Sequence, residues 1–258
     1  MEPYGDVVMP YELMTPAYSG TSPDQRLKNL RNLQEWLQSP EQAGGVHDNL
    51  SVIVGHLLQS IEGSQSHFLQ FDAPLSLLLR ACQFNRTRSS AAERIKQLYV
   101  AQSNLSNLPQ PLSEDLPVPA IVRHAGKGDI YDSSVWLGLQ PTYTPLHRDP
   151  NPNLFCQMVG SKTVRLMRPQ SGAALYACVR RQLGSMGSSR FRGSEMMDGP
   201  ERELLHRAVW ANAEGSNDVK QARLGPGDAL FIPKGWWHSV ASTGHEAELN
   251  ASVNWWFR

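Results

Sequence analysis

The feature that most constrains this chain is a series of short apolar runs in its second half, broken by Pro, Gly and Asn. Each run has the period-two character of a half-buried strand. Several short strands joined by Gly and Pro turns are typical of sandwiches and barrels. We therefore predict a mainly β fold with flanking helices, a jelly roll or double-stranded β-helix. The runs are SSVWLGL, YTPLHRD, NLFCQMVG and KTVRLMRP between residues 133 and 169, and GDALFIP, WWHSVAS and LNASVNWWF between residues 227 and 257.

The two groups of runs are separated by an insertion at about residues 170–222. The insertion is longer than an ordinary loop and carries the low-complexity piece GSMGSSRFRGS, for which we expect mobility. Within the first group, the Gly160-Ser161 pair predicts a hairpin between NLFCQMVG and KTVRLMRP.

The first 96 residues follow a different pattern from the β core predicted at 97–258. Residues 1–22 are rich in Pro, Tyr, Gly and Ser without periodicity, so we expect a loose lead-in. Residues 23–96 are expected to be a helical and mixed N-terminal part. There, SPDQRLKNLRNLQEWLQSP predicts an amphipathic helix that opens at Ser22, and PLSLLLRACQF predicts another. LSVIVGHLLQSIE fits a strand or a helix.

Composition excludes several classes of protein. With 40% hydrophobic and 19% charged residues, the 258-residue chain can bury one large core. The formal net charge of zero argues against a nucleic-acid partner. MEPYGDVVMPYELM does not resemble a signal peptide and PLSLLL is too short to span a bilayer, so we expect a nuclear or cytoplasmic protein that is neither secreted nor membrane-bound. Cys82, Cys156 and Cys178 lack CxxC spacing, which favours packed thiols. No pattern specifies an oligomeric state.

The stretch YTPLHRDPNPN places His147 and Asp149 two residues apart. In a strand, such residues point to the same face, roughly 7 Å apart at about 3.3 Å per residue, so both can reach one ion. His238 is the best third ligand because it lies in KGWWHSV, after the apolar run ALFIP, which predicts a strand next to the barrel interior. Two histidines and one carboxylate form the facial triad of non-haem Fe(II) oxygenases, which leaves three octahedral positions open.

By itself an H-x-D pair is a weak signal, and a loop salt bridge is the alternative. The surrounding residues add weight. Thr144 lies three residues before His147, Asn153 lies four after Asp149, and Lys162 lies thirteen after Asp149. A lysine that faces into an apolar strand is costly unless it meets an anion, whereas a lysine in a turn would simply lie in water.

Four motifs occur in one order and spacing: LYVAQSNL, SSVWLGLQPTYTPLHRDPNPNLFCQMVGSKTVRLMRP, GDALFIPKGWWHSV and SVNWWF. Together they resemble the Jumonji C (JmjC) 2-oxoglutarate oxygenases, which have a cupin-like fold. Within that family they are most similar to the small hydroxylase branch, nearest to the JmjC arginyl hydroxylase. The likeness runs from about Gln97 to the last residue, apart from the insertion. It implies Fe(II), 2-oxoglutarate and O2 as cofactors, and a protein or peptide as substrate.

The resemblance also implies a role for each matching residue. It makes His147, Asp149 and His238 the iron ligands. It assigns five further side chains to the cosubstrate pocket: Tyr99, Trp136, Thr144, Asn153 and Lys162. Of these, Lys162, Thr144 and Tyr99 would bind the distal carboxylate of 2-oxoglutarate. Glu62, in QSIEGS, is assigned to a substrate guanidinium, and Trp255 to the pocket wall and to cation–π contact with the substrate.

Three functions are compatible with these residues. Hydroxylation of a protein side chain, with arginine expected, is favoured by an HxD triad in a compact chain without reader domains. Histone N-methyl-lysine demethylation uses the same iron chemistry, but the family's demethylases more often carry HxE and attached chromatin-reading modules. A non-catalytic cupin-like binding module, or a zinc hydrolase with a bound water, is the third. The set Lys162, Thr144 and Tyr99 argues against the third, because neither needs a dicarboxylate clamp.

Overall fold

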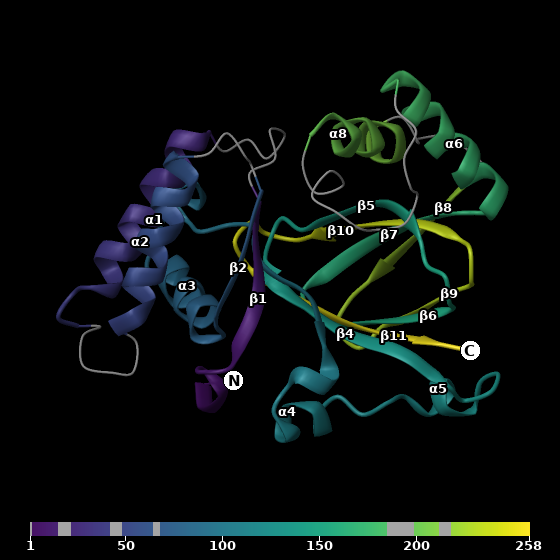
Figure 1. The fold of residues 1–258 in the computed structure, drawn as a ribbon, viewed down its shortest axis with the longest axis horizontal. Helices are drawn as coiled ribbons and strands as arrows, with labels where there is room; N and C mark the ends of the chain where they lie inside the picture. Colours follow the sequence, from purple (N-terminus) through teal and green to yellow (C-terminus); the bar gives the residue numbers. More distant parts are fainter. Residues whose placement is uncertain (1, 15–21, 42–47, 64–67, 185–198, 212–217) are drawn as a thin grey trace. The chain divides into compact units, whose positions relative to one another are not determined.

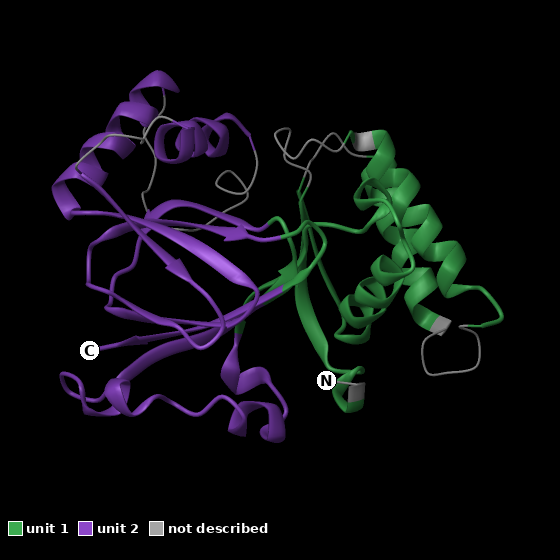
Figure 2. Ribbon diagram, turned by 180° about the vertical axis from the view of Figure 1, so that it is seen from behind, with its two compact units in different colours: residues 1–103, 137–141, 245–249 green, residues 104–136, 142–244, 250–258 purple. Residues whose placement is uncertain are grey.

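The computed structural model describes residues 2–14, 22–41, 48–63, 68–184, 199–211 and 218–258. These residues form two compact units (Figure 2). Unit 1 comprises residues 1–103, 137–141 and 245–249, and unit 2 comprises residues 104–136, 142–244 and 250–258. Two short segments of the C-terminal part therefore belong with the N-terminal unit, which a single boundary after residue 96 does not allow for. None of the helices in the described ranges is long and apolar enough to cross a bilayer.

Unit 1 combines helices with a small antiparallel sheet. Its helices are α1 (Pro23–Leu37), α2 (Asp48–Glu62) and α3 (Ser76–Arg86), with 3-10 turns η1 (Glu2–Tyr4) and η2 (Ala91–Glu93). Its strands lie in the order β2 (Phe68–Pro74), β1 (Val8–Met14) and β3 (Leu98–Asn104). The helix predicted from Ser22 is confirmed as α1, because the Ser22 side chain caps it by accepting from the Gln25 N–H. The ambiguous run at 50–62 is helical, and its buried leucines recur with helical spacing.

Two N-terminal predictions are wrong. Residues 1–22 are not wholly a loose lead-in, because β1 pairs with β2 along its full length and with β3 at Tyr11–Leu13. Met9, Tyr11 and Leu13 are buried in alternation, but Pro10 interrupts the pattern and discourages a strand assignment. The ladder tolerates Pro10 because β3 pairs only from Tyr11 onward. The helix predicted over PLSLLLRACQF begins only at Ser76, as α3, because Pro74, the first residue of this run, ends β2.

Unit 2 contains strands of two antiparallel sheets (Figure 1). The first has the order β4 (Ile130–Leu139), β11 (Leu249–Phe257), β6 (Asn153–Val159) and β9 (Ala229–Ile232). The second has the order β5 (Tyr143–Arg148), β10 (Trp237–Thr243), β7 (Ser161–Met167) and β8 (Val219–Leu224). The short helical elements are η3 (Leu105–Asn107), α4 (Gln110–Glu114), α5 (Ala120–His124), α6 (Pro169–Gln182), α8 (Pro200–His206) and a π-helical turn, η4 (Arg207–Ala211).

Apolar clusters hold these layers together. One cluster draws on strands of both sheets and fills the interior between them: Phe155, Val164, Leu166, Leu224, Ile232 and Val240. A second joins α6 and α8 to the outer face of the β5-β10-β7-β8 sheet, which these helices cover in Figure 1. A third lies on the outer face of the other sheet and includes Val122 of α5. The predicted jelly roll with flanking helices is therefore confirmed.

The chain between β6 and β7 does not form the predicted hairpin. β6 belongs to one sheet and β7 to the other, so Gly160, with φ of 69°, turns the chain from sheet to sheet. The predicted insertion at 170–222 contains α6, α8 and η4, and its end overlaps β8. β8 was not predicted because its residues, VKQARL, show no apolar alternation. Most of the piece GSMGSSRFRGS, with its expected mobility, lies outside the described residues.

Gly172 of α6 lies against Trp237, and a Cβ at this position would overlap the fully buried indole ring. We expect Gly172→Ala to lower the free energy of unfolding by about 1–3 kcal/mol, because the overlap outweighs the helix propensity gained. Gly55→Ala in α2 is the matched control, since its Cβ would meet only the flexible end of Gln34. Urea titrations of both variants measure the difference. Equal stabilisation by both substitutions would contradict the overlap.

Candidate metal centre

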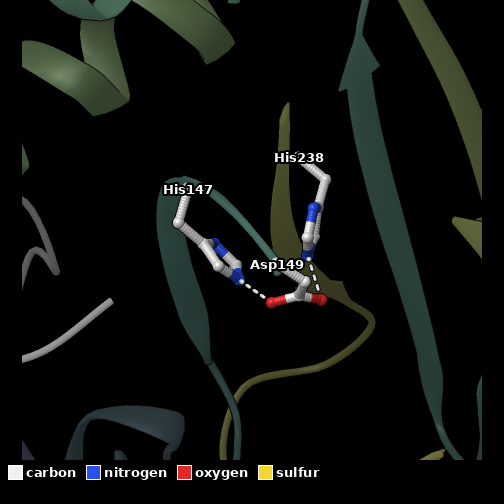
Figure 3. A group of neighbouring side chains, drawn as sticks. All are labelled: His147, Asp149 and His238. Atoms are coloured by element: carbon white, nitrogen blue, oxygen red, sulfur yellow. Dashed lines mark ion pairs between the residues drawn. The ribbon is translucent and has the colours of Figure 1, made fainter. Parts of the chain in front are cut away.

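His147, Asp149 and His238 converge inside unit 2 (Figure 3). His147 on β5 pairs directly with His238 on β10, and Asp149 follows the end of β5. His147 Nε2 lies 3.8 Å from Asp149 Oδ1, and His238 Nε2 lies 3.7 Å from Asp149 Oδ2. One possible ligand atom from each residue lies within 4.8 Å of those of the other two. The three side chains can therefore share one ion.

Both imidazole rings present Nε2 to the centre. His147 Nδ1 donates to the Pro145 carbonyl at 2.9 Å, and His238 Nδ1 lies 3.4 Å from the Trp236 carbonyl. Such bonds set the tautomer and leave the Nε2 lone pair for a metal. Burial and the neighbouring His147 lower the pKa of His238 to about 4, so this ligand is neutral near pH 7.

The Asp149 carboxylate is held by two donors. Trp256 Nε1 donates to Oδ2 at 2.8 Å, and Asn153 Nδ2 donates to the same oxygen at 2.9 Å. Asn153 is itself positioned by Asn254, whose Nδ2 donates to Asn153 Oδ1 at 2.9 Å. Burial acts to raise the pKa of Asp149, but the two histidines and these donors lower it below its ordinary value. The carboxylate is thus fixed in place and kept ionised.

A β-bulge determines where Thr144 lies. His238 pairs with His147, and Val240 pairs with Thr144, so β5 advances three residues while β10 advances two. In a regular strand, Thr144 and His147 would face opposite sides. The bulge returns Thr144 to the interior face, opposite the core residue Val240. Its carbonyl also accepts from Ser239 Oγ at 2.8 Å, which anchors this part of β5 to β10.

Lys162 on β7 points into the same interior and is only 3% exposed. Its Nζ donates to Ser252 Oγ at 2.8 Å and lies 5.4 Å from the centroid of the Phe155 ring. Burial lowers the pKa of Lys162 to about 7. Lys162 pairs with Ser242, four residues along β10 from His238, or about 13 Å at about 3.3 Å per residue. The interior therefore has the candidate metal ligands at one end and a buried lysine at the other.

Strand alternation decides which tryptophans face the interior and which face outward. Trp255 belongs to the apolar cluster on the outer face of its sheet, contrary to the prediction that it walls the pocket. Trp256, one residue later, faces the interior and donates to Asp149. Trp136 alternates with Val135, which packs against the outer cluster, so Trp136 faces the interior. The alternation of polar and apolar residues in SVNWWF was the signal that could have found Trp256.

Tyr99 and Glu62 lie in unit 1, and their roles at the site stay predictions. Tyr99 on β3 is buried and pairs with Glu12 on β1, and burial and the Glu12 carboxylate raise the pKa of its phenol. Glu62, at the end of α2, forms an exposed ion pair with Arg31 of α1. A substrate guanidinium would have to compete with Arg31 for this carboxylate.

Known proteins support the family assignment. A model of the cupin-like domain matches residues 28–258. The chain belongs to the cupin-like domain family. This cupin-like chain is also similar to Jumonji C domain-containing protein 5 of Drosophila melanogaster, with 31% identity over 176 residues, 67% of this chain and 40% of that protein.

Two further relatives of the cupin-like chain are named as demethylases. Lysine-specific demethylase 8 of Danio rerio is 31% identical over 171 residues, 62% of this chain and 36% of that protein. Lysine-specific demethylase JMJ30 of Arabidopsis thaliana is 25% identical over 210 residues, 81% of this chain and 45% of that protein. The chain spans less than half the length of each of the three relatives. The JmjC resemblance is confirmed, whereas none of the three names specifies an arginyl hydroxylase.

Proposed function

We propose that this chain is an Fe(II)- and 2-oxoglutarate-dependent oxygenase that hydroxylates a protein side chain, with arginine as the first substrate to test. One observation carries the proposal. The two-histidine, one-carboxylate set and the buried Lys162 face the same interior. His238 lies four residues along β10 from Ser242, the residue that pairs with Lys162. A dicarboxylate that chelates the metal at one end could place its other carboxylate against Lys162, where a charge-assisted hydrogen bond would hold it.

The residues at this site fit both Fe(II) and 2-oxoglutarate. Two histidine Nε2 atoms and one ionised carboxylate suit Fe(II) and leave open positions for further ligands. Bound iron, with 2-oxoglutarate and O2, would supply the oxidation of an unactivated C–H bond. The part of this chain is to hold Asp149 through Trp256 and Asn153, and to bind the distal carboxylate with Lys162 and Thr144.

The choice of arginine rests on the resemblance. Glu62 pairs with Arg31, and Trp255 lies in the outer apolar cluster, so neither residue adds support for a guanidinium pocket. N-methyl-lysine demethylation is the second candidate, because relatives that cover most of this chain are named lysine-specific demethylases. A binding module without catalysis, or a zinc hydrolase, is the third candidate, and neither function needs a lysine in the interior that the candidate metal ligands face.

Matched peptides distinguish the candidates. Protein reconstituted anaerobically with Fe(II) is given 2-oxoglutarate, ascorbate and 18O2, together with peptides of one sequence that carry arginine, lysine or methylated lysine at a single position. We expect a gain of one labelled oxygen on the arginine peptide and none with His147→Ala. Loss of a methylene with formaldehyde release, and no oxygen gain on any unmethylated peptide, would replace hydroxylation with demethylation.

Succinate is measured in the same samples. Slow conversion of 2-oxoglutarate to succinate without any peptide is expected, because the proposed metal ligands leave positions open for 2-oxoglutarate and O2. If the iron-loaded protein neither binds nor consumes 2-oxoglutarate, the oxygenase proposal fails and the binding module replaces it.

A further inference from the structure

A small cavity in unit 1 lies between α1 and the segment that leads into β3. Its volume is about 20 Å³, which suits one species of about the size of a water molecule or a chloride ion. Three of its lining residues are cationic, Arg26, Arg94 and Lys96, and none is acidic. The remaining lining residues are apolar or carry uncharged amides. The cavity is therefore small, polar and positively charged.

Arg26 is the residue that makes this cavity unusual. Its side chain starts from the second turn of α1 and is only 8% exposed. Nη2 donates to Gln97 Oε1 at 2.8 Å, but Nη1 is buried and has no hydrogen-bond partner in the part of the chain that the structure describes. No described carboxylate forms an ion pair with Arg26. A buried charge with an unused donor is costly unless an acceptor reaches it.

The other two cations at the cavity have different partners. Lys96 is ion-paired with Glu246, and Arg94 donates through Nε and Nη2 to the Arg88 carbonyl, which carries no net charge. The two arginines therefore keep their positive charges at the cavity. Burial lowers the pKa of Arg26 only to about 10, so it stays protonated near pH 7. A water molecule would satisfy Nη1 but not the charge, whereas an anion would satisfy both.

Gln97 is held in a costly backbone conformation that aims its side chain at Arg26. Its φ is 59°, in the left-handed region, although it is not a glycine. Its N–H donates to Leu139 O at 3.0 Å, and its carbonyl accepts from Met14 N at 3.4 Å. Backbone strain of this kind persists where the surroundings over-determine it, as at ligand clamps. The backbone just before β3 thus fixes the position of Gln97 in the cavity wall.

We propose that this cavity binds one small monovalent inorganic anion of chloride size, held by the buried Arg26 guanidinium with Arg94 as the second cation. The anion joins α1 to the start of β3 and stabilises unit 1. It is separate from the proposed oxygenase chemistry, because all of its ligands lie in unit 1 and none is an assigned metal or cosubstrate residue.

Crystals of the full chain grown in bromide test the site directly. We expect an anomalous bromine peak within hydrogen-bonding distance of Arg26 Nη1. A refined water in the cavity, or no density there, while bromide is present at high concentration, overturns the proposal. The result does not depend on any variant folding.

Thermal unfolding gives an independent measurement. Chloride replaces gluconate, which is too large for the cavity, at constant ionic strength. At ten times the Kd for chloride, the unfolding midpoint of the natural chain should rise by about 3–6 °C. Arg26→Met should remove this rise. Arg31→Met, on the same helix but at an exposed position, should retain it. A chloride effect of equal size in Arg26→Met and in the natural chain would show that the ion acts elsewhere.

Discussion

Replacing Asp149 with alanine is expected to weaken Fe(II) binding by at least about 100-fold, since even the loss of an outer-shell partner of a metal ligand typically costs about 10- to 100-fold. Asp149 would provide the carboxylate of the proposed ligand set, and both histidines lie within 4 Å of its oxygens. The substitution also leaves the Trp256 and Asn153 donors without their acceptor. Anaerobic titration with Fe(II), or with Co(II) as a spectroscopic substitute, measures the loss.

The control is Asp129→Ala, which removes an exposed carboxylate of unit 2 that pairs with Arg258. It should bind metal like the natural chain. Circular dichroism of both variants shows that they are folded. Metal affinity that falls less than fivefold in folded Asp149→Ala would remove Asp149 from the ligand set and with it the facial triad.

Lys162→Ala is expected to weaken 2-oxoglutarate binding by about two to four powers of ten and to leave metal binding unchanged. Removing one partner of a buried ion pair typically costs about 3–5 kcal/mol, and each 1.4 kcal/mol is about a factor of ten. Lys220→Ala is the matched control, because Lys220 lies on the neighbouring strand of the same sheet but is exposed. Isothermal titration of the metal-loaded protein measures both affinities. A twofold change for Lys162→Ala would show that this lysine does not meet the distal carboxylate.

The pH dependence of binding gives a second readout of Lys162. Its pKa is about 7 in the ligand-free protein, and a dianionic ligand requires the ammonium form. Below pH 7 the lysine is protonated before and after binding, so this group adds no pH dependence. Above pH 7 binding takes up one proton, so the Kd should rise up to about tenfold per pH unit. Titrations in buffers of different ionisation enthalpy count the proton, and Lys220→Ala should keep the same slope.

The local part of this fold could be predicted from the sequence. Period-two alternation is a property of neighbouring residues, so the strands at 133–169 and 227–257 and the spacing of His147 and Asp149 were predicted without knowledge of any partner. The helix that begins after Ser22 depends on its own cap and on its own apolar stripe. The third ligand, His238, was predicted because its strand is local too, and its direct pairing with His147 agrees with that choice.

The remaining features depend on which strands pair, and strand pairing joins residues far apart in the chain. The bulge in β5 that turns Thr144 inward exists only against β10, and the sheet change at Gly160 is visible only once β6 and β7 have their partners. Which of two adjacent tryptophans faces the candidate metal centre depends on a one-residue register, because a shift of one residue moves every side chain to the other face. The burial of Arg26 likewise results from packing between α1 and the start of β3. The sequence by itself therefore determined the strands at 133–169 and 227–257 and the candidate metal ligands, and the tertiary structure decided their faces, their partners and their burial.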